Sequence, residues 1–154
     1  LASDQRLVEE PQMVNLLDAC GDIAARASRR TGRLVTVTST NPASALVRPS
    51  QFDRAISNLV DNALKFCPTP DNVEINIIGP RVEVIDHGQG IADTDKPLVF
   101  DRFYRATATR ALPGSGLGLA IVKQFADDHS AAVTISDTPG GGATVALSFE
   151  NRVK

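Results

Sequence analysis

The sequence predicts a two-layer α/β sandwich, in which a mixed, mostly antiparallel sheet is covered on one face by three helices. Three segments carry apolar residues at helical spacing, and segments that alternate apolar and polar residues lie between and after them. Four of these strands form two successive hairpins with turns at 79–80 and 139–142, as antiparallel strands do. A doubly wound parallel sheet fits poorly, because it needs a helix between successive strands.

The first half of the chain is expected to hold two helices and two strands. Asn15 has the signature of an N-cap residue, and the helix after it has the apolar stripe Leu16, Leu17, Cys20, Ile23, Ala24 and Ala27. A strand is expected at 34–39, because apolar and polar residues alternate there, and a second strand is expected at 45–48. A second cap signature, Ser50 with Asp53, predicts the start of the next helix. Its core-facing stripe is Phe52, Ala55, Ile56, Leu59, Val60 and Ala63.

The second half is expected to hold one helix and two hairpins. The predicted strands are 73–78, 81–86, 133–136 and 144–149. An irregular stretch, 88–114, is expected to contain one short helical turn at 97–100. A third helix is predicted over 117–127, with Leu117, Ile121, Val122 and Phe125 buried.

Composition is typical of a single soluble domain spanning residues 1–154. Of the residues, 42% are apolar and 22% are charged, and the net charge of -2 argues against a DNA- or RNA-binding module. Cys20 and Cys67 match no metal-ligand spacing and are expected to be free thiols. No signal peptide and no apolar run long enough for a membrane span is found. The first residue, Leu1, suggests a piece of a longer protein.

A polar row is expected on the second helix, opposite its apolar stripe. Asn58, Asn62 and Lys65 are spaced i, i+4 and i+7 and therefore share one face. Asn is a poor helix former, so two of them in mid-helix carry a local cost. The row is either an ordinary solvated face or a site at which amide oxygens meet Mg²⁺ and a lysine meets phosphate.

A carboxylate followed by two glycines ends one of the predicted strands. Asp86 could accept a hydrogen bond from an exocyclic amine such as that of adenine, and Gly88 and Gly90 would let the backbone approach a flat ring. The same residues are also common in simple turns. This pattern alone therefore leaves both interpretations open.

Two further segments could contact phosphate. Gly114 to Leu119 reads GSGLGL and opens the third predicted helix, where backbone N–H groups favour an anion, although a flexible loop is equally compatible. It is neither a Rossmann fingerprint nor a Walker A loop. Within Phe100 to Arg105, FDRFYR, aromatics could anchor a mobile lid while arginines reach phosphate, or the segment could be a packed turn.

Taken in order, these segments resemble the motif series of sensor histidine kinases, within the gyrase, Hsp90, histidine kinase and MutL ATPases. NLVDNALKF (58–66) resembles the N box, DHGQGI (86–91) the G1 box, FDRFYR (100–105) the F box and GSGLGLAIV (114–122) the G2 box. GGGATV (140–145) resembles the glycine-rich segment near the end of such domains. The resemblance spans nearly the whole chain and implies the Bergerat ATP-binding fold, with a lid at about 92–114.

The resemblance also implies a site for ATP and Mg²⁺. Asn58, Asn62 and Lys65 would be the catalytic residues, and Asn62 and Asn58 the metal ligands. The nucleotide would contact Asn62, Lys65, Phe66, Asp86, Gly88, Gly90, Ile91, Arg102, Arg105, Gly114, Ser115, Gly116, Leu117, Gly118, Leu119 and Thr144. The γ-phosphoryl group would pass to a histidine on a separate dimerisation domain of the same receptor and then to a response regulator.

Neither His87, inside the adenine motif, nor His129, expected to be structural at a helix end, resembles the phosphoacceptor, which is expected upstream of Leu1. The parent protein is expected to be anchored in the bacterial inner membrane, with this domain cytoplasmic and touching neither membrane nor nucleic acid. Asn58 stands where ATP-hydrolysing relatives carry a general-base Glu, which predicts weak intrinsic ATP hydrolysis. Two alternatives remain: a serine kinase of the anti-sigma-factor type, and a nucleotide-sensing module without transfer activity.

Overall fold

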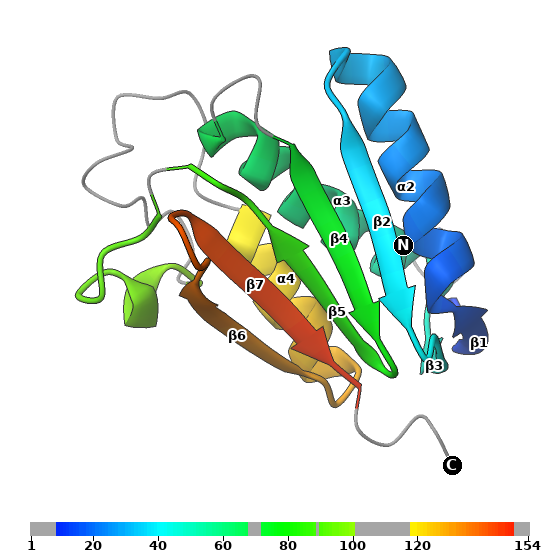
Figure 1. Ribbon diagram of the computed structural model, residues 1–154. Coiled ribbons are helices and arrows are strands. Elements are labelled where there is room, and N and C mark those ends of the chain that lie inside the picture. Colours follow the sequence, from blue (N-terminus) through cyan, green and yellow to red (C-terminus); the bar gives the residue numbers. More distant parts are fainter. Residues whose placement is uncertain (1–8, 68–71, 89, 101–117, 150–154) are drawn as a thin grey trace, which may run out of the picture.

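The computed structural model describes residues 9–67, 72–88, 90–100 and 118–149, in two layers (Figure 1). The main sheet has five strands in the order β2 (Val35–Thr40), β4 (Val73–Ile78), β5 (Arg81–Ile85), β7 (Ala143–Ser148) and β6 (Ala132–Asp137). The β2–β4 pair is parallel, and every other neighbouring pair in this sheet is antiparallel. The predicted mixed, mostly antiparallel sheet is confirmed.

Three helices of the described residues cover one face of this sheet (Figure 1). They are α2 (Leu16–Thr31), α3 (Pro49–Phe66) and α4 (Gly118–Asp128). Helix α3 lies in the middle and packs against both α2 and α4. None of the helices in the described ranges has the length and apolar character needed to cross a membrane.

A second, two-stranded sheet consists of β1 (Gln12–Asn15) and β3 (Ser44–Val47), which pair antiparallel. Strand β3 was predicted, but β1 was not, because its four residues are mostly exposed and lack a buried alternating set. A 3-10 helix, η1 (Lys96–Leu98), overlaps the short turn that was predicted at 97–100.

The first two helices start differently. Asn15 caps α2 as predicted, because its side-chain oxygen accepts a hydrogen bond from the Asp18 N–H at 2.9 Å. The prediction that Ser50 caps α3 is wrong: Arg48 is the N-cap residue and the helix starts at Pro49, which suits a first-turn position. The Ser50 N–H and hydroxyl instead donate to the Glu9 carboxylate, at 3.0 and 2.7 Å.

The core lies between the sheet and the helices. Alternate residues of the central strands point into it: Val73, Ile75, Ile77, Val82 and Val84. Phe52, Phe125 and Phe149 form an aromatic cluster, with ring centroids 6.1–6.2 Å apart. Cys20 and Cys67 are free and buried, and burial raises the pKa of the Cys20 thiol to about 12.

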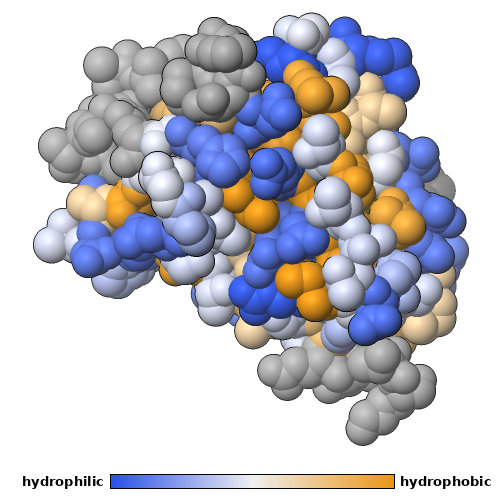
Figure 2. All heavy atoms as spheres, in the orientation of Figure 1, coloured by the Kyte–Doolittle hydropathy of each residue, from blue (hydrophilic) through white to orange (hydrophobic). Residues whose placement is uncertain are grey.

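The opposite face of the sheet, called here the open face, carries no helix among the described residues (Figure 1). Side-chain hydrogen bonds cross it in the series Thr38, Asn76, Glu83, Arg81 and Ser148. Figure 2 shows this face as a mixture of hydrophilic and hydrophobic side chains. The two faces therefore differ chemically, which decides below which strand residues can share a site with the helices.

Candidate functional site

The predicted polar row lies on the second half of α3. Lys65 is exposed, whereas Asn58 and Asn62 are half-buried. The Nδ2 atom of Asn58 is buried and has no hydrogen-bond partner among the described residues. Because buried polar atoms are nearly always paired, this unpaired N–H donor is an unusual feature of the helix face that carries Asn58, Asn62 and Lys65.

Asp86 follows directly after β5, and the two oxygens of its carboxylate differ in their hydrogen bonds. Oδ1 accepts hydrogen bonds from the Gly88 N–H at 2.9 Å and from the Ala143 N–H at 3.2 Å. The Asp86 N–H in turn donates to the Ala143 carbonyl at 3.0 Å. Oδ2 makes no hydrogen bond to another described residue, so it can accept one from a bound amine.

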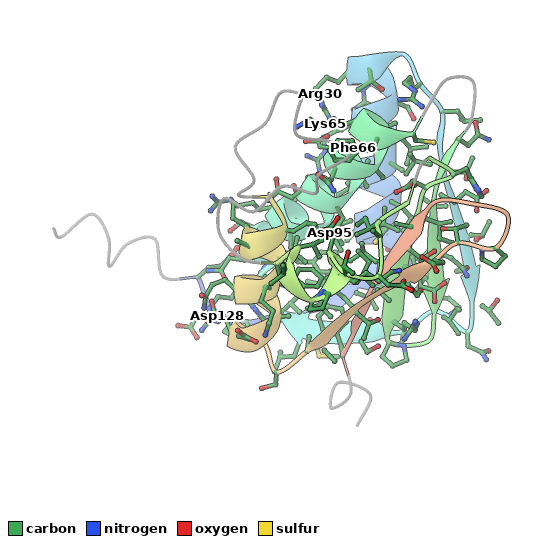
Figure 3. All side chains as sticks on the ribbon, turned by 90° about the vertical axis from the view of Figure 1, so that its left-hand side faces the viewer. Arg30, Lys65, Phe66, Asp95 and Asp128 are labelled. Carbon is green, nitrogen blue, oxygen red and sulfur yellow. The ribbon has the colours of Figure 1, made fainter. Side chains whose placement is uncertain are left out.

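Two glycines allow the loop after β5 to approach its neighbours closely. A Cβ atom on Gly88 would lie 2.0 Å from the carbonyl oxygen of Phe66, the last residue of α3. A Cβ atom on Gly142, whose φ is 108°, would lie 2.1 Å from the carbonyl oxygen of Asp86. These contacts place the end of α3, the loop after β5 and the turn before β7 together, at the end of the sheet that faces the viewer in Figure 3.

Strand alternation determines which side chains can join this group. Val82 and Val84 point into the core, so Asp86, at the same parity, points to the helix side of the sheet. His87 points to the open face, where its Nε2 lies 3.5 Å from the Glu74 carboxylate. Asp86, and not its neighbour, therefore faces α3.

Thr144 is separated from Asp86 by the sheet. It is in register with Ile85 and Ser136, which alternate with core-facing residues, and its hydroxyl lies 2.9 Å from that of Thr138. Its predicted nucleotide contact stays a prediction that this placement does not favour.

Gly142 and Ala143 contact Asp86 directly but were not among the predicted site residues. The sequence signal that could have identified this turn is the run of three glycines at 140–142. In the structure all three have positive φ, a conformation that only glycine adopts readily.

The segment after Gly90 is tied back to the sheet. Ile91 is half-buried, and five residues later the Lys96 ammonium pairs with Asp93 and with Asp137 at the end of β6. The hydrogen bond from Lys96 lowers the pKa of the Asp93 carboxyl. This pair of carboxylates anchors η1 beside the last residue of β6.

Several predicted contacts fall outside the described residues. These are Arg102, Arg105, Gly114, Ser115, Gly116 and Leu117, together with most of the predicted lid. Gly118 is the first residue of α4, and Leu119 packs partly buried against the core. The glycine-rich segment therefore precedes a helix as predicted.

The donor set suits a magnesium ion that arrives with a triphosphate better than a resident metal. No group of three or more His, Cys, Asp or Glu side chains that could hold a metal ion occurs in the described ranges. The side-chain amides of Asn58 and Asn62 offer oxygen ligands on α3. Mg²⁺ binds through few protein oxygens when phosphates and water complete its octahedron, so the residues fit ATP-bound Mg²⁺.

Comparison with known proteins gives one family. The profile described as "Histidine kinase-, DNA gyrase B-, and HSP90-like ATPase" matches residues 47–153. The signal transduction histidine-protein kinase/phosphatase MprB of Mycolicibacterium paratuberculosis is 37% identical over 149 residues, which cover 94% of this chain and 28% of that protein. This chain thus corresponds to little more than a quarter of that relative.

Solved structures agree in fold. A mycobacterial sensor histidine kinase MprB structure superimposes with a TM-score of 0.82 and 31% identity, covering 93% of this chain and all of that one. The ATP-binding domain of PrrB from Mycobacterium tuberculosis has a TM-score of 0.74 at 23% identity, covering 92% of this chain and 97% of that one. The second likeness concerns the fold alone.

Proposed function

Since this chain belongs to the histidine kinase-, DNA gyrase B- and HSP90-like ATPase family, we propose that it binds ATP with Mg²⁺ and donates the γ-phosphoryl group to a histidine. The acceptor would lie on a separate dimerisation domain of the same sensor kinase, and the phosphoryl group would continue to a response regulator. The parent protein would be a receptor anchored in the inner membrane, with this domain in the cytoplasm.

One observation carries the proposal: Asp86 faces the helical layer, and the loop after it packs on the carbonyl of Phe66 at the end of α3. We infer that the carboxylate suited to an amine and the amide-bearing helix border the same space. If they lay on opposite faces of the sheet, as Asp86 and Thr144 do, a common ligand would be impossible.

Different residues would contact the adenine, the metal ion and the phosphates of ATP. Oδ2 of Asp86 would accept from the adenine amino group, because Oδ1 is held by backbone N–H groups. Asn62, with Asn58 beside it, would ligate Mg²⁺, and the Lys65 ammonium would contact phosphate oxygens. When bound, Mg²⁺ would neutralise charge on the phosphates.

Phosphoryl transfer needs little covalent help from the protein, since its transition state is loose and depends on positioning and charge neutralisation. The Asn58 amide, one turn before Asn62, cannot take a proton from water. We therefore expect binding without steady hydrolysis; multiple-turnover ATPase activity by this domain alone would contradict that expectation.

Calorimetry with a non-hydrolysable ATP analogue, with and without Mg²⁺, tests the proposal first. Binding that is tighter with Mg²⁺ supports it, and no binding at millimolar analogue rejects it. A second test supplies ATP and a histidine-bearing dimerisation domain. Acid-labile phosphate on that domain supports a histidine kinase, acid-stable phosphate on a serine of a partner supports the serine-kinase alternative, and binding without transfer supports a sensing module.

A further inference from the structure

The last turn of α3 lacks the usual means of ending a helix. The residue after it, Cys67, has an extended backbone (φ -100°, ψ 119°) and is not a glycine in the left-handed conformation. Helix α2, by contrast, ends at Gly32 with φ 73° and a backbone hydrogen bond to Ser28. The final carbonyls of α3 therefore have to accept hydrogen bonds from water or from a donor elsewhere in the molecule.

Arg33 supplies that donor. Its Nη1 donates to the Leu64 carbonyl at 2.6 Å, and its Nη2 donates to the Cys67 carbonyl at 2.8 Å. The planar guanidinium thus bridges both sides of the helix end, and its positive charge lies where the helix dipole is negative. Arg33 follows the Gly32 cap directly. The turn that ends α2 therefore directs the Arg33 side chain toward the end of α3.

The turn held by Arg33 carries residues of the candidate site. In Figure 3, Lys65 and Phe66 lie at this end of α3, near Arg30 at the end of α2. Lys65 Nζ lies 5.5 Å from the centre of the Phe66 ring, and the Phe66 carbonyl is the atom on which Gly88 packs. A shift of this turn would move Lys65 and change its spacing from Asp86.

We propose that Arg33 is a positioning residue for the nucleotide site: by binding the Leu64 and Cys67 carbonyls, it holds the last turn of α3 against the loop after Asp86. The inference rests on the proposed function, because the ligand whose affinity it sets is ATP. Arg33 itself would not touch the nucleotide.

Arg33→Met is the variant of choice, because it retains an apolar stem while removing the fork of donors. Arg30→Met is the matched control: Arg30 also joins α2 to α3, but it pairs at 2.7 Å with the exposed side chain of Asp61 rather than with the helix end. We expect Arg33→Met to bind a magnesium ATP analogue about tenfold more weakly, and Arg30→Met to stay within about twofold of the original chain.

Amide hydrogen exchange provides the readout that a general loss of stability would not reproduce. Exchange in Arg33→Met should accelerate at residues 63–67 and stay unchanged in the first turns of α3. Arg33→Lys, with one ammonium in place of the fork, should give intermediate affinity and exchange. All affinities are measured well below the melting temperature of each variant.

Unchanged affinity in folded Arg33→Met would overturn the inference, as would exchange that accelerates evenly across the domain. If the original chain binds no analogue, the proposed function fails. The exchange measurement then decides alone whether Arg33 holds the end of α3.

Discussion

The two ends of α3 are held by different kinds of contact. At the first end, Pro49 starts the helix, Ser50 binds the Glu9 carboxylate, and Phe52 is buried in the aromatic cluster. At the last end, Lys65 is exposed, and backbone carbonyls meet Arg33 and Gly88. From this difference we expect substitutions at the first end of α3 to change mainly stability, and substitutions at the last end to change mainly ligand binding.

His129 strengthens the first end. Its ring stacks on Phe125 with centroids 4.2 Å apart, Nδ1 lies 2.9 Å from the Phe125 carbonyl, and Nε2 accepts the Arg48 N–H at 3.2 Å. One ring nitrogen therefore donates while the other accepts, as in a neutral imidazole. The predicted structural role at the end of α4 agrees with this geometry.

Phe52→Ala should give the largest effect and would break the first end. Removing a fully buried aromatic ring leaves a cavity, so we expect the free energy of unfolding to fall by about 3–5 kcal/mol. Urea denaturation followed by circular dichroism measures the loss. Phe66→Ala is the matched variant at the last end: it should cost less stability but weaken analogue binding. Equal losses of stability would refute the comparison.

Asp86→Asn should have the next largest effect, on binding rather than stability. The amide keeps one acceptor for the Gly88 and Ala143 N–H groups but turns Oδ2 into a donor that opposes the adenine amine. We expect affinity for an ATP analogue to fall roughly 100-fold, with or without Mg²⁺. Calorimetry measures it, and a loss confined to magnesium-containing buffer would exclude the adenine role.

Asn62→Ala tests the last end of α3 by distinguishing binding through Mg²⁺ from binding through the adenine base. Removing an oxygen ligand should weaken magnesium-dependent binding about tenfold and leave binding in EDTA nearly unchanged. The same titrations are run in both buffers. An equal loss in EDTA would mean that Asn62 does not act through the metal.

Glu9→Gln should have the smallest effect. It replaces the anion beside the first turn of α3 with a neutral amide, so we expect a loss of about 0.5–1 kcal/mol in the free energy of unfolding and no change in affinity. Glu10→Gln, at an exposed neighbouring position, is the control and should be neutral. A change in analogue affinity for Glu9→Gln would show that the two ends are coupled.

Periodicity predicted most of the fold because helices and buried strands repeat an apolar pattern. The strands at 73–78 and 81–86 differ from the observed elements by at most one residue. The start of α3 was misplaced because Glu9, 41 positions before Ser50, does the work of a local cap. Such a contact depends on how β1 and its neighbours pack, which no local pattern contains.

The candidate site was partly visible in the sequence. Asp86 and the row on α3 could be placed because strand ends and helix faces follow from spacing. The face on which Thr144 lies follows from its register with Ile85, which the sequence did not reveal. Arg33 could not be recognised, because its partners belong to a helix end 31 and 34 positions further along the chain.

The parallel pairing of β2 with β4 has a mechanical consequence. The connection between these adjacent strands contains β3 and α3, so the helix is held between the two-stranded sheet before its start and the five-stranded sheet after its end. Sliding it along its axis would drag β3 and β4 in the same direction and break their strand pairings. The row of amides on α3 is therefore fixed in position relative to both sheets.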